Sequence, residues 1–200
     1  MPRKRSRRIA IATLLAAALL GPAATSHAAP ARAHVALGPV ARAAQQDCAG
    51  ADLTPTARNE DDVRAAILCL HNRIRAERGL PALRENGRLR RAAAAHSGDM
   101  VARGFFEHTA PGGVTMVDRI MAARYVPPRV GWLLGENLAW GTGSLATPRA
   151  VMRAWMDSPG HRANILKRAY REIGIGVVTG TPSDRGVGAT YTADFGVLRR

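Results

Sequence analysis

Acidic and aromatic residues are both scarce in this sequence. Its 200 residues include 15 Asp and Glu against 29 Lys and Arg, which gives a formal net charge of +14, and only 4% are Phe, Trp or Tyr. A basic protein is a candidate for nucleic-acid binding. However, few aromatic side chains are present to stack on bases, and the arginines are scattered between alanines and form no stripe. We therefore predict no nucleic-acid partner and read the basic surface as suited to anionic wall polymers or lipid head groups.

Long hydrophobic runs are also missing. The apolar stretch 9–20 is twelve residues long, whereas a membrane-spanning helix needs about 20. It follows the basic segment 1–8 and precedes small residues that end at Ala28, which is typical of a cleaved secretory signal peptide. We predict a signal peptide at 1–28, a secreted or extracytoplasmic location and no transmembrane segment after cleavage. An uncleaved N-terminal anchor is the alternative, and the export route stays open.

Cysteine occurs only at Cys48 and Cys69. Two cysteines in an exported protein are typical of one disulfide. The bond would close a loop of about 20 residues and contribute roughly 3 kcal/mol through chain entropy. Two free thiols are the alternative, and a metal pair is disfavoured because no further cysteine or CxxC spacing is present.

The chain divides into three parts by composition. After the signal peptide at 1–28, residues 29–58 are rich in Ala, Pro and Arg without a sustained period, and we read them as a linker. Regular patterns begin at 59, so we place one domain at 59–200. Helices followed by antiparallel strands indicate an α+β fold. The apolar spacing and the capping residues predict helices at about 59–78, 87–104, 114–125, 147–157 and 158–166, and β-rich runs predict a hairpin of 172–180 with 189–198; the stretch 127–143 is too rich in Pro and Gly for one long element.

The histidines differ in their local context. His34 lies in the linker and has no assigned role. His71 and His96 share faces with apolar helix residues, which favours packed, hydrogen-bonded side chains. His108 follows a helix end in an irregular segment, and His161 follows a Pro-Gly bend. Loop positions held by rigid elements are where sites tend to be built, so we take these last two as site candidates.

A third candidate is Glu136, in the stretch GENLAWG. A carboxylate in such apolar surroundings must be solvated, paired or hydrogen-bonded. Two imidazoles and one carboxylate could bind a divalent metal such as zinc or transfer protons as acid and base. No local motif such as HExxH, GxSxG or a P-loop is present, and Ser97 and Ser158 both have helical explanations. We therefore predict His108, Glu136 and His161 as catalytic residues, with His108 and His161 as ligands of a possible zinc ion.

Six motifs in register carry a resemblance to a known family. The sequence resembles the bacterial branch of the CAP superfamily, the SCP-like domain shared with cysteine-rich secretory proteins, plant pathogenesis-related proteins and insect venom allergens. The resemblance covers about 62–198 and implies a three-layer α-β-α sandwich around a central antiparallel sheet, with strands inside 125–143. It rests on HNRIRAERGLPAL, AAAHSGDMVARGFFEHTAPGG, GENLAWG, WMDSPGHRANIL, EIGIGVV and YTADFG.

The resemblance also implies a cleft that carries two histidines and two acidic residues. The first histidine matches His108, the acid of the GEN motif matches Glu136, and the second histidine matches His161. The second acid is missing, because Ser158 stands where the eukaryotic pattern has a glutamate. Asp157 is adjacent, but one step along a helix turns a side chain by about 100°. This departure argues against paired-carboxylate chemistry.

These observations lead to a prediction of function. We predict an exported, monomeric protein whose His/Glu cleft is hydrolytic toward cell-envelope or peptide substrates. The alternative is a non-enzymatic binding module for a lipid, a peptide or a wall polymer. A third possibility is a structural domain in which the histidines only hold the cleft walls together. Family membership does not decide among them, because one fold supports many functions.

Overall fold

The computed structural model describes residues 47–183 and 186–199, and the structural statements below refer to these. The predicted signal peptide and residues 29–46 of the predicted linker lie outside them. A four-stranded sheet with the strand order β1-β3-β4-β2 lies at the centre. The elements are α2 (Glu60–Ala76), β1 (Arg84–Glu85), α3 (Gly87–Arg103), α4 (Met116–Ala122), β2 (Gly131–Thr142), the 3₁₀ turn η1 (Gly143–Ala146), α5 (Pro148–Asp157), α6 (Pro159–Ile165), β3 (Glu172–Thr179) and β4 (Gly188–Arg199).

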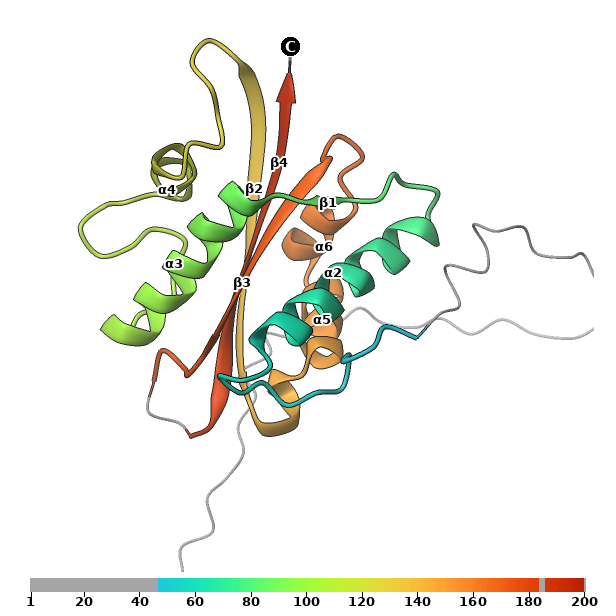
Figure 1. Ribbon diagram of the computed structural model, residues 1–200, viewed down its shortest axis with the longest axis vertical. Helices are drawn as coiled ribbons and strands as arrows, with labels where there is room; N and C mark the ends of the chain where they lie inside the picture. The colour runs from blue at the N-terminus through green and yellow to red at the C-terminus, as the bar shows by residue number, and fades with distance from the viewer. Residues whose placement is uncertain (1–46, 184–185, 200) are drawn as a thin grey trace, which may run out of the picture. The chain divides into compact units, whose positions relative to one another are not determined.

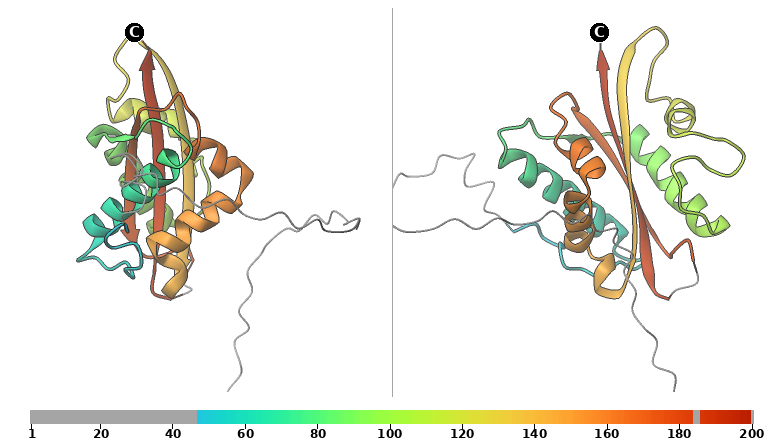
Figure 2. Two further views of the ribbon diagram at one scale, coloured as in Figure 1. Left: turned by 90° about the vertical axis from the view of Figure 1, so that its right-hand side faces the viewer. Right: turned by 180° about the vertical axis from the view of Figure 1, so that it is seen from behind.

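Helices cover both faces of the sheet. Helices α3 and α4 lie on one face, and α2, α5 and α6 lie on the other (Figures 1 and 2). Strands β3 and β4 form the predicted antiparallel hairpin, and β4 also pairs antiparallel with β2. The two-residue β1 adds a parallel pairing to β3, so the sheet is mixed. The predicted α+β, three-layer class is confirmed. No helix within the described ranges is long and apolar enough to cross a membrane.

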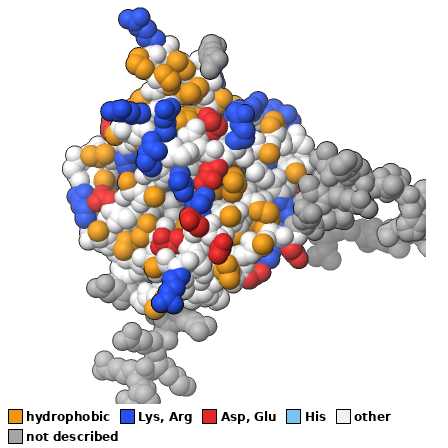
Figure 3. Space-filling model, viewed as in Figure 1, with side chains coloured by type: hydrophobic (Ala, Val, Ile, Leu, Met, Phe, Trp, Pro, Cys, Tyr) orange, Lys and Arg blue, Asp and Glu red, His pale blue; other side chains and the backbone are white. Residues whose placement is uncertain are grey.

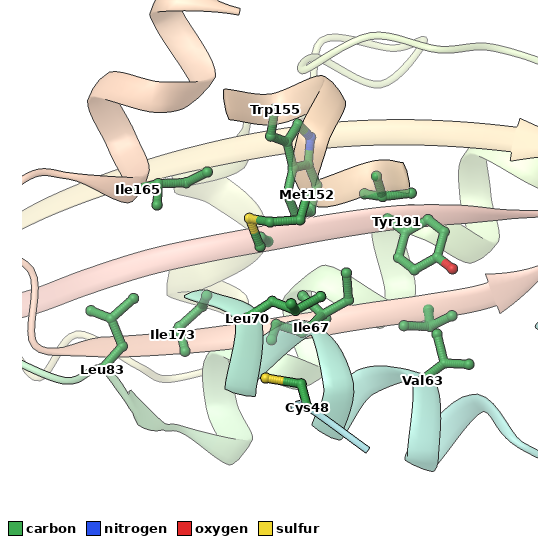
Figure 4. Packing of buried hydrophobic residues seen from close by; sticks show 14 of the residues in the cluster. Cys48, Val63, Ile67, Leu70, Leu83, Met152, Trp155, Ile165, Ile173 and Tyr191 are labelled. Carbon is green, nitrogen blue, oxygen red and sulfur yellow. The ribbon is translucent and has the colours of Figure 1, made fainter. Parts of the chain in front are cut away.

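The larger core lies between the sheet and α2 and α5. Successive strand residues point to opposite faces, and β3 and β4 place their odd-numbered apolar residues on this side. Ile173 and Tyr191 pack there against Ile67 of α2 and Trp155 of α5, and all four are at most 1% exposed (Figure 4). Fully burying one such side chain contributes about 1.5–3 kcal/mol. The amphipathic faces read from the sequence therefore hold the layers together.

The opposite face of β3 brings α3 into close contact. A Cβ atom on Gly174 would lie 2.1 Å from the backbone of Leu89, and one on Gly176 would lie 2.4 Å from that of Ala93. These distances are far below van der Waals contact. The GIG pattern of β3 therefore positions α3 directly on the sheet, and α3 in turn positions the loop that carries His108.

The disulfide prediction is confirmed. Cys48 and Cys69 are bonded, and Cys48 is 4% exposed within the larger core. The bond attaches the turns that precede α2 to the middle of that helix. In the chain-entropy model a loop of this size contributes roughly 3 kcal/mol.

Strand β2 corrects one expectation from the sequence. The local pattern of 127–143 is too rich in Pro and Gly to predict one long element, but Gly131–Thr142 forms a strand of 12 residues. The strand lies inside 125–143, where the family resemblance implied strands. The glycines are tolerated because other chain segments approach them closely. A Cβ on Gly135 would lie 2.2 Å from the hydroxyl of Tyr170, and one on Gly141 would lie 2.4 Å from the carbonyl oxygen of Leu145. Tertiary contacts thus override the local preference for a turn.

His71 is part of the core, as its apolar helix face indicated. The side chain is fully buried, and its ring lies 5.6 Å from the rings of both Trp155 and Phe195. Its Nδ1 donates to the carbonyl oxygen of Ile67 at 2.8 Å. Burial lowers the pKa of His71 to about 4, so this histidine is neutral at physiological pH and contributes packing.

Candidate functional site

The centre of the site is the contact between His108 and Glu136. Glu136 lies in the middle of β2 on the face covered by α3 and α4, and its side chain is 2% exposed. His108 lies in the loop between α3 and α4, and its side chain is 59% exposed. Nδ1 of His108 lies 2.7 Å from Oε1 of Glu136. Two of the predicted site residues therefore meet, although 27 residues separate them in the sequence.

Arg119 completes the charge balance of this pair. It lies on α4, its side chain is 9% exposed, and Nη2 donates to Oε2 of Glu136 at 2.7 Å. The same nitrogen donates to the carbonyl oxygen of His108 at 3.0 Å. Arg119 therefore holds both the carboxylate and the loop that carries the histidine. The sequence signalled that Glu136 needs a partner, but it did not indicate which arginine supplies the charge.

These contacts shift the pKa values of Glu136 and His108 in opposite directions. Burial alone would raise the pKa of Glu136, but the hydrogen bond from His108 and the charge and hydrogen bond of Arg119 outweigh it, so this pKa lies below its usual value. The hydrogen bond to Glu136 raises the pKa of His108. The contacts therefore favour the ionised form of Glu136, and the imidazole beside it binds a proton more readily than a free histidine does.

A second carboxyl group faces Glu136 from the neighbouring strand. Asp194 of β4 is the register partner of Glu136 and points to the same face of the sheet. It is fully buried, and neither carboxyl oxygen has a hydrogen bond of normal geometry among the described residues. Burial, followed by the charge of Glu136, raises the pKa of Asp194 well above its usual range. Burial and the neighbouring carboxylate therefore favour the protonated form of Asp194.

The carboxyl group that lies beside Glu136 is thus Asp194, which the sequence did not indicate as a site candidate. Asp157, the weak substitute for the missing second acid, is the last residue of α5 and is exposed. The stretch YTADFG carried a signal that could have identified Asp194. Its period-2 alternation buries Tyr191 and Phe195 on one face, so Asp194 must point to the other face, next to β2.

Replacing Asp194 by Asn is expected to stabilise the protein at neutral pH. Because the folded state raises the pKa of Asp194, its contribution to stability is present below the unfolded value near pH 4 and is lost as the pH rises. Asn keeps the shape but needs no proton, so we expect the variant to be more stable than the parent protein at pH 8 and to differ less from it at pH 4. Urea unfolding at both values measures this. Asp157→Asn, on the exposed end of α5, is the control, and destabilisation by Asp194→Asn at pH 8 would contradict a neutral acid at this position.

His161 lies on α6, which covers the face of the sheet opposite to α3 and α4 (Figures 1 and 2). Its carbonyl oxygen accepts a hydrogen bond from Nδ2 of Asn137 at 3.0 Å, and Nδ2 of Asn164 donates to the carbonyl oxygen of Glu136 at 3.1 Å. Helix α6 is therefore attached to the strand that carries Glu136. Nδ1 of His161 is buried without a partner among the described residues. Burial, and then the charge of His108, lowers the pKa of His161. The two imidazoles interact electrostatically, and no hydrogen bond joins them.

A pocket of about 290 Å³ opens beside the first histidine. It is large enough for several water molecules or a small ligand group. His161 does not line it. Its lining residues are His108, Thr109, Thr115, Met116, Val117 and Glu136.

The donors present do not form a complete protein metal site. Among residues 47–183 and 186–199, no group of three or more His, Cys, Asp or Glu side chains is arranged to hold a metal ion. Catalytic zinc usually has three protein ligands, and both oxygens of Glu136 are already bonded to His108 and Arg119. His108 and His161 would supply two ligands at most, so zinc binding by this pair stays a prediction.

The fold and the site together define a class of protein. An α-β-α sandwich with a histidine and a buried glutamate joined across the edge strand is an SCP-like domain. The family model described as the cysteine-rich secretory protein family, CAP, matches residues 68–195, and the chain belongs to this family. The resemblance read from the six motifs is confirmed.

The individual relatives are bacterial. The chain is 36% identical to the uncharacterized protein YkwD of Bacillus subtilis over 112 residues, which is 56% of this chain and 41% of that protein. It is 30% identical to the uncharacterized membrane protein YlbC of the same organism over 111 residues, 56% of this chain and 30% of the relative. The chain thus spans less than half the length of these curated relatives.

Solved structures show the same fold. An extracellular protein containing an SCP domain from Bacillus anthracis superposes with a TM-score of 0.57 and 26% identity, over 74% of this chain and 45% of that chain. An outer surface protein from Borrelia burgdorferi has the same TM-score at 19% identity, over 74% of this chain and 98% of that chain, and this likeness concerns the fold alone.

Proposed function

We propose that this protein is an extracytoplasmic CAP-domain hydrolase in which His108 activates a water molecule. The observation that carries the proposal is the 2.7 Å contact between Nδ1 of His108 and Oε1 of Glu136. A disulfide is typical of oxidising, extracytoplasmic compartments, and the relative from Bacillus anthracis is described as extracellular. Both support a location where cell-envelope polymers and peptides are the available substrates.

The hydrogen bond to Glu136 determines what His108 can do. An ionised carboxylate only accepts, so Nδ1 carries the proton and Nε2 carries the free lone pair. Arg119 keeps Glu136 ionised, and the carboxylate stabilises the imidazolium that forms when Nε2 removes a proton from water. The raised pKa of His108 makes its imidazole a stronger base than that of a free histidine. This is the orienting role that the acid has in a catalytic triad.

Water is the attacking group in this proposal, because the pocket offers no activated side-chain nucleophile. No serine or cysteine lines it, and the hydroxyl of Thr109, which does, has no hydrogen bond to a base among the described residues. The hydroxyl of Thr115 is bonded to Asp118 at 2.6 Å in the capping box of α4. The two cysteines are bonded to each other.

Zinc-assisted hydrolysis is a separate, testable alternative. His108 and His161 would hold the ion with water in the open positions, and the ion would supply a more acidic bound water. Nε2 of His108 cannot serve as a metal ligand and as a base at the same time. Added zinc therefore inhibits turnover if His108 is the base and stimulates it if the histidines are ligands.

A non-enzymatic binding module is the second candidate. The observation that favours it is that both oxygens of Glu136 are already hydrogen-bonded, while Met116 and Val117 give the pocket an apolar wall. Such a pocket suits part of a lipid, a peptide or a wall polymer. This candidate predicts a ligand that co-purifies with the protein and no turnover.

One experiment separates these functions. The purified protein and His108→Ala would be incubated with bacterial wall material and with a mixed peptide library, each with zinc and with a chelator. Mass spectrometry then identifies new chain ends. Ends made by the parent and lost in the variant support the hydrolase, and the bond cut names its substrate class. No new ends in any condition, together with a co-purifying ligand that His108→Ala loses, would replace the hydrolase by the binding module.

A further inference from the structure

The outer edge of β3 is paired over only part of its length. β1 reaches as far as Ile173, whose carbonyl oxygen accepts from the backbone N–H of Asn86 at 2.8 Å. On the other side, the N–H of Gly180 donates to the carbonyl oxygen of Gly188 in β4 at 2.8 Å. The hydrogen-bonding direction alternates along a strand. The N–H and C=O groups of Ile175 and Val177 therefore point away from β4, toward the part of the β3 edge with which β1 does not pair.

These outward groups have no partner in the part of the chain that is described. No hydrogen bond from a backbone or side-chain group reaches the outer edge at Ile175 or Val177. Ile175 is 1% exposed and Val177 is 7% exposed. Buried backbone groups are nearly always paired, so the unpaired groups at this edge are an exception. Ile175 and Val177 both line a pocket, through which a ligand can reach these groups.

The next position along the edge shows how such a donor is satisfied. The N–H of Thr179 donates to Oε1 of Glu60 at 2.8 Å. A side-chain carboxylate on α2 thus occupies the place of a strand carbonyl. About 13 Å of edge lies between Ile175 and Thr179 at 3.3 Å per residue, which is room for an added strand of about four residues.

A pocket of about 250 Å³ lies along this edge. Its floor is Ile175, Val177 and Ala94, and its walls come from α2 and α3. In Figure 1 β3 runs between these two helices, and Figure 3 shows acidic and basic side chains close together at the centre of the same face. The charged side chains in the lining are Glu60, Asp61 and Arg64 of α2 and Arg90 and Arg91 of α3.

The two walls carry opposite charge. Arg90 and Arg91 are exposed, and neither forms an ion pair among the described residues. On the α2 side, Arg64 is bonded to Asp61 and to Glu85. Oε1 of Glu60 accepts from the N–H and the hydroxyl of Thr179, so Oε2 is the oxygen of this carboxylate that remains for a ligand. A strand added here points alternate side chains toward α3 and toward α2. Acidic side chains therefore fit the α3-facing positions, and basic ones fit the α2-facing positions.

We propose that the edge of β3 between α2 and α3 binds an extended peptide of about four residues as an added strand, with acidic and basic side chains in alternation. The backbone of Ile175 and Val177 supplies the pairing groups, and the two charged walls select the side chains. This is peptide recognition by strand addition. The proposal is independent of the chemistry at His108, because the site lies at the opposite edge of the sheet.

Amide NMR with a defined peptide tests the proposal. The probe is an acetylated, amidated octapeptide of alternating Glu and Lys, added to the ¹⁵N-labelled protein. We expect the amide signals of Ile175 and Val177 to shift with saturation, and their hydrogen exchange to slow at least tenfold. A peptide with four Glu followed by four Lys, and the alternating peptide with every amide N-methylated, should each bind at least tenfold more weakly. Equal binding of the N-methylated peptide, or no shift at millimolar peptide, would overturn the proposal.

Variants of the edge and of its wall provide the second arm. Val177→Pro removes one outward donor without removing a bond to β4, and it should abolish binding. Arg90→Glu with Arg91→Glu should weaken the alternating peptide at least tenfold and favour a peptide in which Lys replaces Glu. This charge reversal tests the proposal even if the proline variant fails to fold. Arg168→Glu, an exposed change on the connection from α6 to β3, is the matched control. Shifts of the same amides with protein concentration alone, together with dimers in sedimentation, would assign the edge to a second copy of the chain and overturn the peptide.

Discussion

His108→Ala is expected to lower kcat/KM by a factor of about 10² to 10⁴, the usual contribution of a positioned general base. Folding should be almost unaffected, because the His108 side chain is 59% exposed and Glu136 keeps its 2.7 Å bond to Arg119. The measurement is the rate at which new chain ends appear, on whichever substrate the parent protein cuts. Glu107→Ala removes an exposed carboxylate next to His108 and is the matched control, for which we expect no change.

The pH profile gives this prediction a second readout. A base must be unprotonated, so kcat/KM should rise with pH through the pKa of His108. The bond to Glu136 raises that pKa above the usual value near 6.5. Glu136→Gln removes the negative charge, so we expect the rising limb to move to lower pH as the maximum falls. A limb that stays in place would show that another group titrates.

Activity that survives His108→Ala would remove the histidine from the mechanism. A fall in activity that parallels a fall in stability would instead indicate the structural role. Unfolding curves of each variant therefore accompany the kinetics.

Arg75→Ala is expected to lower the free energy of unfolding by about 2–6 kcal/mol, because each buried carbonyl group left without a donor costs about 1–3 kcal/mol. Arg75 is fully buried near the end of α2. Its Nε donates to the carbonyl oxygen of Pro81 at 2.8 Å, and Nη1 donates to that of Ile165 at 2.7 Å. It also donates to the carbonyl oxygens of Lys167 and Tyr170 at 3.1 and 3.3 Å. Removal of this side chain leaves the carbonyl oxygens of Pro81 and Ile165 without a donor among the described residues. The carbonyl oxygen of Lys167 keeps the N–H of Tyr170, and that of Tyr170 keeps the guanidinium of Arg171.

Urea unfolding of paired variants checks this effect. The lysine in Arg75→Lys cannot reproduce the planar fork, so it should recover only part of the loss. Arg78→Ala, an exposed change in the turn after α2, should alter stability by less than about 0.5 kcal/mol. A total stability of 5–15 kcal/mol is typical of a domain, so the alanine variant should be close to unfolding. A loss below about 1 kcal/mol would show that water replaces the guanidinium.

The strands differ in how well local sequence patterns predict them. The β3–β4 hairpin could be predicted because its runs and its loop are local features. The local pattern did not predict β2, because its glycines are typical of turns, and only the family resemblance implied strands inside 125–143. The glycines are accepted only where Tyr170 and the backbone of Leu145 approach the strand. Such contacts depend on how the chain folds back on the strand, so no local pattern predicts them.

For the candidate site as well, the sequence determined some features and the tertiary structure determined others. The sequence by itself determined the α+β order of elements and the disulfide pair. It also indicated His108, Glu136 and His161 as candidates. These predictions rest on residue type, spacing and family motifs, all of which are properties of the sequence. Only the tertiary structure decided that His108 contacts Glu136, that Arg119 is the arginine that neutralises it, and that Asp194 is the second acid. The physical reason is that the charge balance of a buried group depends on strand register and helix packing. The β2–β4 register and the position of α4 bring together side chains that the sequence holds far apart.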